Sequence, residues 1–208
     1  MAEELARIAK PRVERFKGKR ILYLVPLLFS SEDSPQKYME KFKLYWKQVE
    51  EHVTNLELKI GEVKRVYHES ITSGGEDGLK VMEKLNPSSY QIVKGKCQAG
   101  AELEATEDKE LADECMDWER HLLMGFFSQK VAQTVVDSYT QALGKRYEHI
   151  SRRIDETLKD NEAAILFIRE GHMVQFSQDI EVFSVAPPAL DEIHRWLRER
   201  PPKEKKRK

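Results

Sequence analysis

A histidine follows the most apolar short segment of the chain. Residues 163–168 read Ala-Ala-Ile-Leu-Phe-Ile, and Gly171 and His172 come soon after them. Such a run predicts a buried strand, and ligands of open α/β sheets bind beyond the carboxyl ends of strands. A neutral imidazole at that place could ligate a metal ion or transfer a proton. The alternative is an exposed histidine in an ordinary connection between strands.

Glu69 stands in a comparable position in the first half of the chain. It comes at the end of residues 63–69, whose alternating pattern predicts another strand. If the two predicted strands are neighbours in one sheet, Glu69 and His172 could meet at its edge. These two residues are therefore the candidate catalytic pair.

A basic turn precedes the apolar strand. His149, Arg152 and Arg153 are three and four residues apart on a predicted helix, so their side chains could converge on a phosphate or carboxylate group. Arginines on a charged helix also pair with acidic neighbours such as Asp155 and Glu156, and that surface pairing is the alternative. His149, Arg152 and Arg153 are the candidates for binding a small anionic ligand.

An acidic helix supplies the candidate metal ligands. Asp113, Asp117 and His121 follow one another at steps of four residues, which places them near one helical face. Carboxylate oxygens and an imidazole suit a divalent ion such as Mn, Fe or Zn. The alternative is a solvated face, because acidic residues are also favourable near the amino end of a helix. A divalent metal is the cofactor that this pattern could hold.

These residues need a sheet and long helices to position them. Four strands are expected, over residues 20–25, 63–69, 163–168 and 180–185. Long helical patterns fill the middle of the chain, with Thr106 as a helix cap and a break at Gly144. The prediction is an α/β fold in which long helices pack on a small mixed or mostly parallel sheet of about four strands.

One domain is expected over residues 1–200, with a largely helical insertion around 76–160. Residues 201–208 are almost purely charged and predict a disordered tail. Near the other end, residues 3–16 place Leu5, Ile8, Val13 and Phe16 at helical spacing. Pro11 must interrupt or restart that helix, because it lacks a backbone donor.

Composition excludes several classes of function. The 35 basic and 36 acidic residues nearly cancel, so no global field indicates a nucleic-acid partner. Cys97 and Cys115 are the only cysteines and are not closely spaced, which fits a reduced cytoplasmic location. The longest apolar run, residues 21–29, is too short to span a bilayer, so no membrane is expected.

The C-terminal quarter of the chain resembles the TraB/ChaN/erythromycin-esterase-like superfamily. The resemblance rests on Arg152-Arg153-Ile154 and on residues 163–172, a strand that ends near Gly-His. It implies that Arg152 or Arg153, His172 and Glu69 occupy the polar site, where metal-dependent hydrolysis has been inferred for some members. The first strand of such proteins leads into a Gly-x-x-His element, whereas residues 24–29 contain neither glycine nor histidine. The resemblance therefore favours binding over catalysis.

Three functions are consistent with these patterns. The first is a domain that binds a small anionic ligand or a protein partner at the strand ends. The second is a metal-dependent hydrolase with His172 and Glu69 as ligands or proton carriers and Arg152 stabilising negative charge. The third is an interaction protein whose long helices pair with a second copy of the chain.

Overall fold

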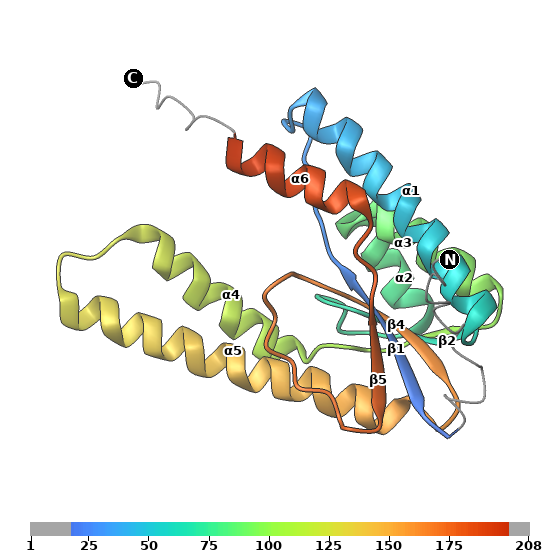
Figure 1. Cartoon of the computed structure of the whole chain (residues 1–208). Coiled ribbons are helices and arrows are strands. Elements are labelled where there is room, and N and C mark those ends of the chain that lie inside the picture. The colour runs from blue at the N-terminus through green and yellow to red at the C-terminus, as the bar shows by residue number, and fades with distance from the viewer. Residues whose placement is uncertain (1–17, 200–208) are drawn as a thin grey trace, which may run out of the picture.

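The computed structural model describes residues 18–199 (Figure 1). The predictions of a helix over residues 3–16 and of a disordered tail over 201–208 lie outside the described residues. The α/β prediction is confirmed: helices enclose a single parallel sheet of five strands. Within residues 18–199, no helix has both the length and the apolar character needed to cross a bilayer.

The sheet has the strand order β3-β2-β4-β1-β5. Its strands are β1 (Arg20–Pro26), β2 (Val63–His68), β3 (Glu102–Leu103), β4 (Ala163–Ile168) and β5 (Ile180–Ser184). The sequence predicts about four strands, and the additional one is β3. A strand of two residues is too short to show an alternating pattern.

Strand β4 is the centre of the sheet. All six of its residues are buried, and it pairs with β1 on one side and β2 on the other. A parallel strand covered on both faces reads as a continuous apolar run, which is the pattern that made residues 163–168 conspicuous in the sequence. Because β2 and β4 are direct neighbours, the residues that follow them lie at the same edge.

Helices cover the two faces of the sheet unequally (Figure 1). Residues of α1 (Gln36–Lys59), α2 (Gly75–Leu85), α3 (Pro87–Gln98) and α6 (Pro188–Glu199) join one apolar core with β1 and β4. The second core contains residues of α5 (Gln129–Thr157), such as Ile150 and Ile154, packed with Leu22 and Leu166. Within the described part of the chain, the face on the α5 side is thus covered by one helix and by the segment between β4 and β5.

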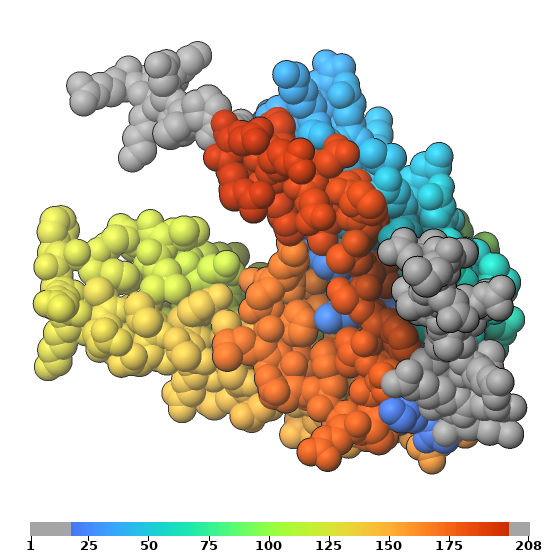
Figure 2. Space-filling model, viewed as in Figure 1, coloured from blue at the N-terminus to red at the C-terminus, as the bar shows by residue number. Residues whose placement is uncertain are grey.

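The middle of the chain is largely helical. Helices α2 to α5 occupy Gly75 to Thr157, and the short strand β3 lies among them. Helix α4 (Lys109–Met124) and the first part of α5 form a hairpin that projects away from the sheet (Figure 1, Figure 2). The expected helix break at Gly144 is wrong, because α5 continues through this residue for 29 residues. The expected cap Thr106 is also wrong: Asp108 caps α4 through Leu111 N at 3.0 Å.

The buried centre of the sheet predicts a large effect of one truncation. Ile165→Ala should lower the free energy of unfolding by about 2–5 kcal/mol, because it removes a fully buried side chain from β4 and leaves a cavity. Urea unfolding measures this change. Val182→Ala on β5, where the side chain is 39 % exposed, is the control and should change stability by only about 0.5 kcal/mol. Equal effects at the two positions would contradict the assignment of β4 as the core strand.

Candidate functional site

Two glutamates and two arginines meet at the carboxyl edge of the sheet. Glu69 follows β2 and is 1 % exposed, whereas Glu107 precedes α4 and is 3 % exposed. Arg146 lies within α5 and is buried, and Arg169 follows β4 and is partly buried. These four residues, named here the Glu–Arg cluster, join four separate segments of the chain.

Arg146 connects both carboxylates. Its Nε donates to Glu107 Oε2 at 2.6 Å, and its Nη2 donates to Glu107 Oε1 and, at 3.1 Å, to Glu69 Oε1. Arg169 holds Glu69 from the other side: its backbone N–H donates to Oε2 at 2.7 Å and its Nε donates to Oε1 at 2.5 Å. Both carboxylates are therefore fully engaged, and the four charges cancel.

The backbone brings the two glutamates together through local turns. The Glu69 N–H donates to the carbonyl of Phe167 at 2.8 Å, which carries the pairing of β2 and β4 one residue past the strand. Ser70 then adopts a left-handed backbone with φ of 71°, and its N–H donates to Glu107 Oε1 at 2.9 Å. The N–H groups of Thr106 and Glu107 each donate to the carbonyl of Ile71 at 3.0 Å. The segments that carry Glu69 and Glu107 are thus tied directly to each other.

Burial and pairing with carboxylates shift the pKa values of the two arginines in opposite directions. Burial lowers the pKa of Arg146, but the hydrogen bond and charge of Glu107 and the charge of Glu69 outweigh it, so the pKa is raised. For Arg169, burial also lowers the pKa, and Glu69 more than compensates. Both guanidinium groups are held charged. A charged group whose pKa is shifted by burial and by a specific partner in a cavity wall is a candidate functional residue.

Two histidines flank the cluster. Burial lowers the pKa of His172, against the opposing effect of the nearby Glu69 carboxylate, and its buried Nδ1 has no hydrogen-bond partner among residues 18–199. Burial lowers the pKa of His68 to about 4. The His68 Nδ1–H donates to the carbonyl of Glu69 at 2.5 Å, and Nε2 lies 3.0 Å from the Ser89 hydroxyl oxygen. Burial therefore favours the neutral form of both imidazoles.

A cavity of about 330 Å³ opens beside the cluster. Its walls include Arg146 and Arg169 together with Ser70, Thr72, Lys109 and Tyr139. Acidic side chains are also present: Asp113, which pairs with Lys109, and Glu119 on α4. Among the described residues, no acceptor bonds to Nη1 of Arg146 or to Nη1 and Nη2 of Arg169. Guanidinium donors are thus available in the cavity wall.

The structure brings together part of the predicted site. Glu69 lies in the Glu–Arg cluster, and His172 lies close enough to Glu69 for its carboxylate to influence the pKa of the imidazole. The residues of the predicted basic turn contact groups other than the Glu–Arg cluster. Arg153 pairs with Glu104 and Glu156, and Arg152 lies beside His149 with Nη2 3.3 Å from Nδ1.

The predicted metal row does not form a metal site. Asp113 pairs with Lys109, and Asp117 pairs with Arg120 at 3.1 Å, while the His121 ring lies against Trp118. Basic residues one turn away therefore neutralise both carboxylates on an exposed helix face. Over residues 18–199, no group of three or more histidine, cysteine, aspartate or glutamate side chains is placed to hold a metal ion.

Sequence reasoning missed Arg146, Glu107 and Arg169. A signal for Arg146 exists: the buried row of α5 places Ala142, Arg146, Ile150 and Ile154 at steps of four residues. A charged residue within such a row requires a buried partner. Glu107 carries no comparable signal, because an acidic residue near a helix start is ordinary.

Removing Arg146 should strongly destabilise the protein. Arg146→Met leaves Glu107, whose side chain is 0 % exposed, without its guanidinium partner. The expected loss in the free energy of unfolding is about 3–5 kcal/mol, measured by chemical denaturation. Arg120→Met, which breaks an exposed pair with Asp117, is the matched control and should cost less than about 1 kcal/mol. A similarly small loss for Arg146→Met would show that the buried cluster is unimportant for stability.

Burial of neutral His68 should make stability fall in acid. Between pH 6.5 and about 4 the unfolded chain binds a proton on His68 that the folded chain does not, so the free energy of unfolding decreases as the pH falls through this window. The decrease due to His68 should be about 3 kcal/mol and should end below the folded pKa. Denaturation at several pH values measures it, with His68→Gln as the comparison. If parent and variant lose stability equally over this range, His68 is not the group responsible.

No family model, curated protein or solved structure matches this chain. The resemblance of the C-terminal quarter to the TraB/ChaN/erythromycin-esterase-like superfamily stays a prediction. The site is defined by its own geometry: a cavity at the carboxyl ends of β2 and β4, with two arginines held in its wall by buried carboxylates.

Proposed function

We propose that the protein binds a small anionic ligand in the cavity beside the Glu–Arg cluster. The ligand's carboxylate or phosphate group faces Arg169 and Arg146. The hydrogen bonding of Arg169 supports this proposal. Its Nε and backbone N–H donate to Glu69, while its two terminal nitrogens have no acceptor within residues 18–199. A guanidinium with a fixed Nε and free terminal nitrogens is pre-organised to accept an anion.

The pairing of most acidic side chains around the cavity is compatible with an anionic ligand. Glu69 and Glu107 are neutralised by the two arginines, and Asp113 is neutralised by Lys109. An arriving anion therefore meets free N–H groups without a net negative charge directly behind them. Hydroxyl groups of Ser70, Thr72 and Tyr139 lie in the same walls and can donate further hydrogen bonds to oxygen atoms of the ligand. The acidic Glu119 opposes anion binding from the α4 side.

The position of the cavity also supports ligand binding. It lies beyond the carboxyl ends of two neighbouring parallel strands, the edge at which open α/β sheets bind their ligands. Two buried charge pairs cost desolvation energy that apolar residues would not, so their presence at this edge is better explained by a binding role than by stability alone.

Calorimetric titration with inorganic phosphate tests the proposal. Arg169→Gln should weaken phosphate binding by about tenfold or more, because it removes the charged donors, while the backbone N–H bond to Glu69 persists. Glu119→Gln should strengthen binding, because it removes an opposing charge that lies outside the cluster.

Arg152→Gln provides the matched control. Arg152 is an arginine of α5 that lies against His149, away from the cluster. Its removal should not change the phosphate affinity. Circular dichroism establishes that each variant is folded. Equal affinities of the parent and Arg169→Gln, or a parent that binds neither phosphate nor a small dicarboxylate at millimolar concentration, would refute the proposal.

A further inference from the structure

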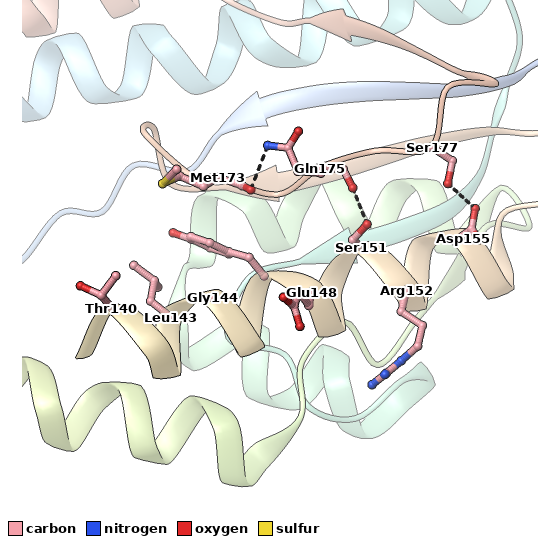
Figure 3. Close-up of a pocket in the computed structure, with 11 residues that line it drawn as sticks. Thr140, Leu143, Gly144, Glu148, Ser151, Arg152, Asp155, Met173, Gln175 and Ser177 are labelled. Atoms are coloured by element: carbon pink, nitrogen blue, oxygen red, sulfur yellow. Dashed lines mark hydrogen bonds between the residues drawn. The ribbon is translucent and has the colours of Figure 1, made fainter. Parts of the chain in front are cut away.

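A second and larger cavity forms a groove along another side of α5. It has a volume of about 590 Å³ and lies between α5 and the chain that leads from β4 to β5 (Figure 3). From α5 it is lined by residues such as Leu143, Tyr147 and Asp155, and from the loop by Met173 and Ser177. The groove shares neither Arg146 nor Arg169 with the cavity proposed to bind an anion.

The middle of the groove is apolar and uncovered. Met173 is 71 % exposed beside Leu143 and Tyr147, and Val136 one turn before Thr140 is 43 % exposed. On the same face of the sheet, Val182 of β5 pairs with Leu22 of the α5-side core and is 39 % exposed. This face has α5 as its only helix among residues 18–199, whereas four helices contribute to the opposite core.

Gly144 lies in the wall of this groove. It stands in the middle of a continuous helix, where glycine is unfavourable, and a Cβ placed on it would meet no atom within 4 Å among the described residues. The backbone conformation of α5 does not require glycine here. A glycine in an open helix face allows another segment to approach closely.

The chain enters the described structure at one end of the groove. The Gly18 N–H donates to Asn161 Oδ1 at 2.8 Å, and Arg20 Nη2 lies 2.6 Å from Asp155 Oδ1. The same Asp155 oxygen accepts from the Ser177 hydroxyl at 2.7 Å, and both residues line the groove. The described part of the chain therefore begins near the Asp155 end of the groove.

The length and pattern of that segment match the groove. Leu5, Ile8, Val13 and Phe16 are at helical spacing, and a helix over residues 5–16 spans about 17 Å. Along α5, the wall from Leu143 to Asp155 spans about 18 Å. Residues 1–17 contain five basic and three acidic side chains, and the groove wall carries Glu148 and Arg152 together with Asp155, which pairs with Arg20.

We propose that residues 5–16 bind in this groove of the same chain as an amphipathic helix, interrupted or restarted at Pro11. The apolar side chains cover Leu143, Tyr147 and Met173, and the segment passes over Gly144. It leads directly into β1, so the sheet face on the α5 side gains a second helix. The occupant is the chain's own N-terminal segment rather than a second copy.

Amide hydrogen exchange of the full chain, followed by mass spectrometry, tests this proposal. Amides of residues 5–16 should exchange on the order of tenfold or more slowly than in the isolated peptide. Gly144→Phe places a side chain in the groove without a clash in the described structure, and it should restore fast exchange in residues 5–16. Gly95→Phe, at an exposed glycine of α3 with equally open space, is the matched control and should leave the protection unchanged.

A second variant changes the segment instead of the groove. Ile8→Asp should also abolish the protection, and it should increase exchange along residues 143–155 of α5. The proposal is overturned if residues 5–16 of the parent exchange at the rate of the isolated peptide, or if Gly144→Phe leaves them protected. Protection that occurs only at concentrations where light scattering detects a dimer would also overturn it, because the occupant would then be a second copy.

Discussion

Arg146 places a positive charge inside the protein, and the arrangement around it follows from the need to neutralise that charge. A buried cation is costly unless carboxylates and hydrogen bonds surround it. Glu107 supplies two acceptor oxygens and Glu69 supplies a third. These contacts connect α5 to the end of β2 and to the start of α4, three segments that are distant in sequence. A charge on one helix therefore determines how the helical insertion is joined to the edge of the sheet.

The same contacts shape the proposed binding cavity. Glu69 accepts from Arg146 and also fixes Arg169 just beyond the end of β4. Arg169 is thereby held next to hydroxyl groups on the loop after β2, and no acceptor of residues 18–199 bonds to its terminal nitrogens. The position of Glu69 between Arg146 and Arg169 therefore has two consequences. It neutralises charge inside the cluster, and it leaves hydrogen-bond donors available in the cavity. Binding of an anion would complete the hydrogen bonding of Arg169 without disturbing the buried pairs.

Patterns of apolar residues predicted the architecture well, since they report burial directly. The continuous run of β4 and the long stripes of α1 and α5 identified the core, whereas two-residue β3 left no pattern. Charged residues were harder to place. His149, Arg152 and Arg153 are close in sequence, yet α5 turns them toward different neighbours. Arg146 and Glu107 are 39 residues apart and meet only through the fold. Spacing along one helix cannot reveal such a pair, although a charge within a buried row does indicate that a partner must exist.

The central claim is that the arginine held by Glu69 accepts an anion in the cavity beside it. The most direct measurement is nitrogen-detected NMR of the arginine guanidinium groups during titration with inorganic phosphate. The account predicts that the Nη signals of Arg169 shift and sharpen as phosphate is added, because their rotation becomes hindered, while those of Arg152 stay unchanged. Arg169 signals that do not respond to phosphate, or that respond no more than those of Arg152, would contradict it.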